Sequence, residues 1–202
     1  MSEILPIFPL RMVLFPGCRV SLHIFEDRYK QMITECVEDE TEFALILGQD
    51  DDFNDVGCSA SVVEVINRLP DGRMNIIIKG VDRIRVIERH ADKPYITGEI
   101  ERVADVEDEP KKSLAEKTRA LYAEALQLSI GWYRAPKEEG EPAGSLSYTI
   151  ASTLGMPIER QQALLELTSV QGRFQFLKEM LENTLRGLRE HSRKVTGNGK
   201  AH

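Results

Sequence analysis

The spacing of apolar residues divides the chain into two halves. From Leu5 to about Val103, apolar residues come in short runs or alternate with polar ones, which is typical of β-strands. From Ser113 onward they recur every three or four residues, which predicts helices. The segment between the halves is charged, contains a proline and has no periodicity. We therefore predict a β-rich domain over 1–104, a linker over 105–112 and a helical subdomain over 113–195.

The first half is predicted to contain one helix and about six short strands. An apolar face every three to four residues places the helix around 29–37. Pro70 and Gly72 supply the residues that a tight turn needs between two of the strands. The acidic stretch 49–55 is expected to be a loop. The strand candidates lie at 19–25, 43–47, 61–68, 73–79, just after Gly80, and at 96–101. Closing these strands into a small barrel would remove their exposed edges.

The second half is predicted to contain four helices. Ser113 and Glu116 have the spacing of a capping box at the start of the first helix. Gly155 is suited to ending the second. The polar stretch 134–144 is expected to be a loop, and 196–202 has no apolar anchor and is expected to be a disordered tail. The expected helices are 113–132, 146–154, 158–167 and 170–188.

Composition and charge narrow the function. The chain has 202 residues, 42% of them hydrophobic, and a formal net charge of -7. An acidic chain has no general attraction to nucleic acid or anionic lipid, so neither is expected as a partner. No window reaches the ~18 apolar residues that a membrane-spanning helix needs. The three cysteines form no C-x-x-C pair. We expect reduced, structural thiols and a cytoplasmic location.

Several short motifs appear in one fixed order along the first half. They are Pro-Ile-Phe-Pro-Leu at 6–10, Leu-Phe-Pro-Gly at 14–17, Ile-Phe-Glu-Asp-Arg-Tyr at 24–29, Val-Gly at 56–57, Leu-Pro-Asp-Gly-Arg at 69–73, and Gly80 with Arg83. As a set covering about residues 4–103, they resemble the substrate-binding domain at the amino terminus of Lon proteases. Cereblon and free-standing bacterial proteins carry the same domain. One departure is Ile84, where relatives often carry phenylalanine, and it concerns local packing alone.

The resemblance implies an α+β fold. The expected architecture is a small six-stranded pseudo-β-barrel of the PUA-like kind with one helix, followed by an all-helical bundle subdomain. In Lon proteases this region is thought to engage unfolded or damaged proteins ahead of the ATPase motor and the protease. This chain looks like a free-standing bacterial member without those two domains.

The catalytic groups of Lon proteases have no counterpart in this sequence. No G-x-x-x-x-G-K-[ST] motif is present to bind ATP. The Gly-Asn-Gly-Lys run at 197–200 has no strand before it, so we interpret it as a chance match. Ser113 and Ser145 lie where helices are expected to start and are interpreted as caps rather than nucleophiles. We therefore predict no enzyme activity, no catalytic residue and no cofactor.

Other candidate chemistry receives a structural interpretation. The histidines at 23, 90, 191 and 202 lack metal-ligand spacing, so no metal site is expected. Cys18 with His23 is a conceivable nucleophile pair, but a packed or hydrogen-bonded His23 is the favoured interpretation. Arg83, Arg85 and Arg89 are predicted to share one face of a strand and could bind an anion or RNA. Pairing with the many carboxylates is favoured instead.

The leading prediction is a non-catalytic polypeptide-binding module that recognises unfolded or damaged segments in protein quality control. The predicted polypeptide contacts are Phe53 in the acidic loop and Trp132 with Tyr133 before the second loop. The partners would be unfolded or peptide segments of other proteins. An ATP-dependent protease is a further candidate partner.

Two alternatives stay open. The first is an adaptor that delivers clients to a separate protease, with Phe176 and Met180 on the long last helix as its docking face. The second is a Lon-like protein with hydrolase activity of its own.

Overall fold

The structure of the protein is a computed structural model that describes residues 3–49, 52–130 and 142–197. The chain folds into two compact units. The first unit comprises Met1–Ala104 together with Met156–Glu166, and the second comprises Asp105–Gly155 and Leu167–His202. The predicted helical subdomain over 113–195 differs from this division in one segment, because Met156–Glu166 groups with the strands.

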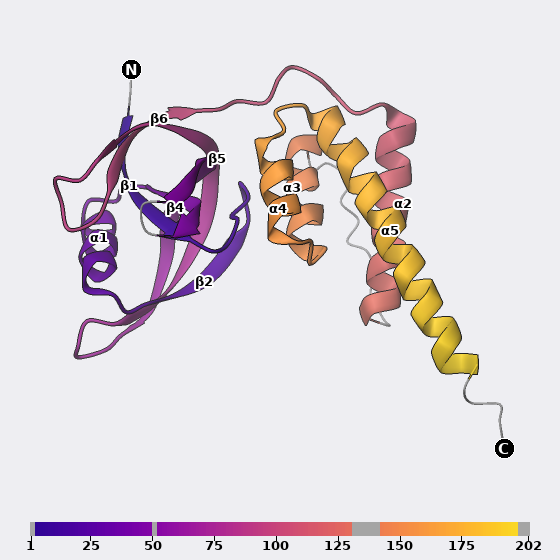
Figure 1. Cartoon of the computed structure of the whole chain (residues 1–202), viewed down its shortest axis with the longest axis horizontal. Coiled ribbons are helices and arrows are strands. Elements are labelled where there is room, and N and C mark those ends of the chain that lie inside the picture. The colour runs from indigo at the N-terminus through magenta and orange to yellow at the C-terminus, as the bar shows by residue number, and fades with distance from the viewer. Residues whose placement is uncertain (1–2, 50–51, 131–141, 198–202) are drawn as a thin grey trace. The chain divides into compact units, whose positions relative to one another are not determined.

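The first unit contains six strands and two helices (Figure 1). The strands are β1 (Glu3–Leu10), β2 (Arg19–Ile24), β3 (Phe43–Gln49), β4 (Asp52–Arg68), β5 (Met74–His90) and β6 (Thr97–Arg102). The helices are α1 (Asp27–Glu38) and α4 (Ile158–Glu166). The predicted α+β class and the six strands are confirmed. The predicted break at Gly80 is wrong, because one strand of 17 residues runs through that position.

Five of the strands close into a ring. Their order is β5-β4-β3-β1-β6, and β6 pairs again with β5. The sixth strand, β2, lies outside this closed circuit and pairs with the first part of β5, at Met74–Lys79. The same part of β5 pairs on its other side with residues 61–68 of β4. We call this three-stranded extension, made of β2, residues 61–68 and residues 74–79, the arm.

The strands β1 and β3 are buried on both faces. They run parallel, with Ile7 opposite Ala44 and Phe8 opposite Leu45. Ile7 and Ala44 belong to one apolar cluster inside the unit, whereas Phe8 and Leu45 belong to a second cluster that α1 covers. A strand with two buried faces needs a continuous apolar run instead of alternation. This explains the sequence Phe-Ala-Leu-Ile-Leu at 43–47.

A glycine contact connects the ring to the arm. Gly17 has φ +80° and donates its N–H to the carbonyl of Gly80, while Gly80 donates to the carbonyl of Cys18. This pattern is a G1 bulge, which needs glycine at its first position. A Cβ on Gly80 would lie 2.3 Å from the carbonyl oxygen of Phe15. Both glycines are therefore required where β2 joins β5.

The second unit contains three helices: α2 (Lys112–Ile130), α3 (Ala143–Thr153) and α5 (Val170–Gly197). Helix α3 ends before Gly155, whose φ of +56° fits the predicted stop. Helix α5 extends nine residues past its predicted end, so Thr196 and Gly197 of the predicted tail are helical. Residues 198–202 of that tail, and most of the predicted loop at 134–144, lie outside the described residues.

The predicted linker is bound to the second unit by specific contacts. The guanidinium of Arg173 is fully buried and forms a bidentate pair with Asp105, at 2.7 and 2.6 Å. It also donates to Ser147 Oγ and lies 4.5 Å from the ring centroid of Tyr148. Asp108 accepts the backbone N–H of Val170 at the start of α5. Two of the linker's carboxylates therefore hold it to the helices.

We predict that Asp105→Ala lowers the free energy of unfolding by roughly 3 kcal/mol, because it leaves the buried guanidinium of Arg173 without its counter-charge. Urea denaturation followed by circular dichroism measures this loss. Glu107→Ala is the matched control, since Glu107 is an exposed carboxylate of the same segment. Equal losses in the two variants would contradict the assigned role of Asp105.

Candidate functional site

Exposed apolar side chains gather on the arm. In the described part of the chain, nine large apolar residues are exposed, and five of them lie on or next to the arm. These five are Phe25, Val63, Val65, Ile66 and Leu69. Phe25 directly follows β2, where its ring stacks at 6.0 Å on that of His23. A local concentration of exposed apolar groups is typical of a binding surface.

Two irregularities in β4 place Val63 and Ile66 in solvent. The register between β4 and β5 shifts between Val62 and Glu64, and again between Val65 and Asn67. Val63 and Ile66 therefore have no partner residue on β5. Such β-bulges re-aim side chains and increase the local twist of a strand. In a regular strand, successive residues would lie on opposite faces of the sheet. The bulges explain why all residues from 63 to 68 are exposed instead.

The arm has two open edges. Strand β4 pairs with β3 only up to Ala60, so residues 61–68 have β5 as their one strand neighbour among the described residues. Strand β2 likewise pairs with β5 alone within the described ranges. An open edge presents unpaired backbone N–H and C=O groups that another strand can bind.

A polar row on the outer face fixes the three strands relative to one another. Asn75 donates from Nδ2 to Asn67 Oδ1 at 2.9 Å, so its own Oδ1 faces the other way as an acceptor. His23 Nδ1 lies 2.7 Å from that Oδ1 and is therefore the protonated ring nitrogen. His23 is exposed but has a structural hydrogen-bond partner, which fits the hydrogen-bonded alternative of its interpretation.

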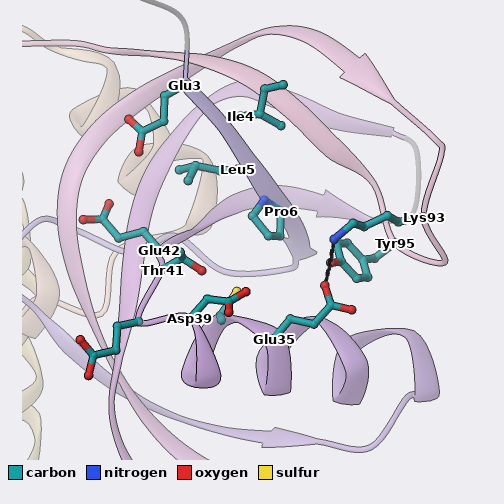
Figure 2. A pocket seen from close by; sticks show the side chains of 12 residues that line it. Glu3, Ile4, Leu5, Pro6, Glu35, Asp39, Thr41, Glu42, Lys93 and Tyr95 are labelled. Atoms are coloured by element: carbon teal, nitrogen blue, oxygen red, sulfur yellow. Dashed lines mark hydrogen bonds and ion pairs between the residues drawn. The ribbon is translucent and has the colours of Figure 1, made fainter.

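A cavity of about 480 Å³ lies elsewhere in the first unit (Figure 2). Its walls come from the first half of β1, the end of α1 with the following turn, and the connection between β5 and β6. The lining residues are Glu3, Ile4, Leu5, Pro6, Glu35, Cys36, Asp39, Glu40, Thr41, Glu42, Lys93 and Tyr95. Carboxylates outnumber cations in this wall.

Most of the charge in the cavity is already neutralised. Glu35 accepts hydrogen bonds from Tyr95 and from Lys93, as Figure 2 shows. These bonds lower the pKa of Glu35 to about 2. The hydrogen bonds of Lys93 to Tyr95 and to Glu35 raise the pKa of Lys93, while burial and the bond to Glu35 raise that of Tyr95. Arg102 pairs with Glu3 at 3.0 Å and with Glu42 at 3.1 Å. These contacts connect α1 to the segment between β5 and β6, and connect β1 and the residue before β3 to β6.

The cavity offers no activated nucleophile. Cys36 is its one thiol, and burial raises the pKa of that thiol. A thiol of raised pKa stays protonated and reacts poorly. Glu35 has a lowered pKa, whereas a general base at neutral pH needs a raised one. The paired side chains in the cavity wall are therefore suited to stabilising the fold and not to acid–base catalysis. In the described residues, no group of three or more His, Cys, Asp or Glu side chains is placed to hold a metal ion.

The predicted exposure of Phe53 is wrong. Phe53 belongs to β4, pairs with Gly48 and is 8% exposed. The guanidinium of Arg89 covers its ring at 3.9 Å. The predicted acidic loop at 49–55 is mostly strand, because an apolar ring in this position completes one of the two cores.

The other predicted site residues have different outcomes. Trp132 and Tyr133 lie outside the described residues. Phe176 and Met180 are both half-buried on α5, one helical turn apart. They offer a smaller apolar surface than a fully exposed docking face would, and their role stays a prediction.

The three arginines of β5 bind groups of the protein itself. Arg83 is buried and donates to the carbonyls of Leu165 and Ala104. Arg85 pairs with Glu101 at 2.9 Å, and Arg89 pairs with Asp55 at 3.1 Å. Cations satisfied in this way are poorly placed to bind phosphate groups.

The exposed apolar residues of the arm are not evident from the sequence. The segment Val-Val-Glu-Val-Ile at 62–66 predicts a strand, but its pattern does not assign each residue to a face. Its lack of alternation is the one available signal, because a one-sided strand should alternate. That signal indicates an irregular strand but does not reveal the bulges.

Comparison with known proteins gives a consistent family. The family model of the ATP-dependent protease La (LON) substrate-binding domain matches residues 4–183. The chain is similar to the Lon protease of Anaeromyxobacter dehalogenans, with 29% identity over 95% of this chain and 24% of that protein. It is also similar to Lon protease 2 of Myxococcus xanthus, with 27% identity over 96% of this chain and 25% of that protein. The chain thus spans about a quarter of the length of these relatives.

Two solved structures share the fold. The Lon N-terminal domain protein from Xanthomonas campestris has a TM-score of 0.68 and 23% identity, covering 87% of this chain and 96% of its own. The N-terminal domain of the Mycobacterium avium complex Lon protease has a TM-score of 0.75 and 17% identity, covering 89% and 98%. Among the described residues, no helix has the length and apolar character to cross a membrane.

We predict that Glu35→Gln lowers the free energy of unfolding by about 1 kcal/mol at pH 7, because the partly exposed carboxylate loses its charge-assisted bonds. The folded-state pKa of Glu35 lies below its ordinary value of 4.5, so its contribution is complete above pH 4.5 and is lost as pH falls toward 2. Urea denaturation at pH 7 and pH 3 should show the gap between wild type and variant narrowing in acid. A constant gap, or an equal loss in the exposed control Glu38→Gln, would contradict this assignment.

Proposed function

The chain belongs to the LON substrate-binding domain family, and from that premise we propose that it binds segments of other polypeptides without acting on them chemically. The exposed apolar residues of the arm carry the proposal. Unfolded and damaged proteins differ from folded ones chiefly by the apolar side chains and free backbone groups that they expose. The arm presents both complementary features, apolar groups and open strand edges.

The proposal includes the statement that this chain binds polypeptides without catalysing a reaction. The family model that matches is that of a substrate-binding domain, and the relatives named as proteases are about four times longer than this chain. The cavity of the first unit supports the same proposal, because burial raises the pKa of its thiol and Glu3, Glu35 and Glu42 in its wall are paired with cations.

The proposal extends to the biological setting. The clients would be unfolded or damaged segments, and the process would be protein quality control in the cytoplasm. Delivery of clients to a separate ATP-dependent protease is the second candidate function, and the half-buried pair Phe176 and Met180 on α5 is its proposed docking face. Co-purification that is lost in a Phe176→Ser, Met180→Ser double variant would favour this adaptor role.

We predict that the double variant Val63→Ser, Ile66→Ser binds an unfolded client about tenfold more weakly than wild type. Each substitution removes part of an exposed apolar side chain, and a tenfold change corresponds to about 1.4 kcal/mol. Fluorescence anisotropy with labelled, reduced and carboxymethylated lactalbumin measures the affinity.

The matched control is Ile87→Ser, which removes an equally exposed isoleucine from the far end of β5. It should leave the affinity unchanged. A wild-type chain that does not bind the client would overturn the proposed function. If the double variant binds the client as tightly as wild type does, the arm is not the binding surface. ATP hydrolysis or casein cleavage by pure protein, abolished by one of its own substitutions, would overturn the non-catalytic role.

A further inference from the structure

We propose that the open edge of β2 binds an extended, acidic client segment by strand addition, with client carboxylates placed against Arg19 and Lys79. The inference rests on the proposed function and specifies which segments are bound and how. It is carried by three features of the arm: the direction of the β2 backbone groups, the regularity of that edge, and two cations that have no carboxylate within ion-pair distance among the described residues.

The G1 bulge determines which backbone groups point outward. Gly80 donates to Cys18, and this position acts as a hydrogen-bonded pair of the antiparallel ladder. Hydrogen-bonded and non-hydrogen-bonded pairs alternate along such a ladder. Arg19, Ser21 and His23 therefore direct their N–H and C=O groups away from β5, toward the open edge.

The β2 edge is more regular than the β4 edge. Six consecutive residues of β2 pair with β5 without a shift, from Arg19 opposite Lys79 to Ile24 opposite Met74. No proline interrupts them. The β4 edge carries two bulges, which obstruct the pairing of a further strand. Strand addition therefore favours β2, which is the edge of the arm opposite the bulged residues of β4.

Arg19 and Lys79 form a site of unbalanced positive charge. They lie directly opposite each other in a non-hydrogen-bonded pair, the closer of the two pair types, and both are exposed. Like charges in this position destabilise a sheet. In the described residues, neither cation has a carboxylate within ion-pair distance, although the chain carries 33 acidic residues. A carboxylate from a bound strand would relieve the repulsion.

The geometry specifies the pattern of the bound segment. An added strand would lie about 4.8 Å from β2, with alternate side chains on the two faces. Its outer residues would lie beside Arg19, Ser21 and His23, and its inner residues beside the half-buried Val20 and Leu22. The preferred segment therefore alternates apolar with polar residues and carries Asp or Glu at the Arg19 end.

A second copy of this chain fits the edge less well. Antiparallel pairing of two β2 strands would bring Arg-Val-Ser-Leu-His-Ile against itself. This sequence contains no acidic residue, so the charge of Arg19 would stay unbalanced. Charge complementarity therefore favours a client segment over self-association.

The test compares two labelled peptides, Val-Asp-Val-Asp-Val-Asp-Val and the same peptide with Lys for each Asp. Fluorescence anisotropy should show the acidic peptide binding at least tenfold more tightly to wild type, with a preference that weakens in high salt. The double variant Arg19→Glu, Lys79→Glu should reverse the preference. An unchanged preference in this variant would overturn the inference.

A proline tests the strand-addition mode separately. Ser21→Pro removes an outward N–H and leaves the ladder to β5 intact, as proline on an edge strand does. It should weaken binding of the acidic peptide about tenfold, whereas Ser21→Val, which keeps the N–H, should not. Circular dichroism and thermal melting check that both variants fold. If Ser21→Pro does not fold, the charge-reversal variant alone decides.

The outcomes separate the inference from the proposed function. If wild type binds unfolded lactalbumin but shows no preference between the peptides, the inference fails and the proposed function stands. If it binds neither client nor peptide, both fail. Self-association of the free chain that Ser21→Pro abolishes, without peptide binding, would overturn the client assignment in favour of a second copy.

Discussion

The backbone contact between Gly17, Cys18 and Gly80 determines how the first unit is built. It joins the loop before β2 to the middle of the long strand β5. The contact fixes where β2 begins and which of its residues pair with β5. It also lies at the boundary where β5 passes from the arm into the ring, since Ala60 of β4 is opposite Gly80. A side chain at either glycine would move this boundary, because one needs a positive φ and the other a backbone approach without a Cβ.

This boundary gives the two halves of β5 different surroundings. Beyond Gly80, β5 lies between β4 and β6, and every strand of the ring has a neighbour on both sides. Before Gly80, it lies between β2 and residues 61–68 of β4, which are the two edges of the arm. The ring buries its edges and supplies stability, while the arm keeps its edges available. The ring is closed and the arm is open because β5 belongs to both, with different neighbouring strands before and after Gly80.

Much of this fold could be predicted from the sequence, since it depends on local patterns. The hairpin turn at 69–72, the face of α1 and the stop at Gly155 each rest on residues close in sequence, and the structure contains all three. Phe53 could not be placed in this way, because Arg89, which covers it, comes from a different strand. The grouping of α4 with the strands depends on long-range contacts such as that of Gln162 with Val56. The candidate site escaped prediction for the same reason, since the bulges in β4 are a property of its register with β5.

A domain with open strand edges must also avoid pairing with itself. The arm meets this constraint differently on its two edges. On β4, the bulges at Val63 and Ile66 disrupt the regular spacing that a further strand requires, so the apolar side chains can be exposed without forming a flat template. On β2 the edge is regular, and antiparallel pairing with a second β2 strand would place no carboxylate beside Arg19 and Lys79, so their mutual repulsion would remain. Repulsion, unlike a bulge, is removed by a partner of opposite charge. The β2 edge therefore favours an acidic strand over a second copy of this chain.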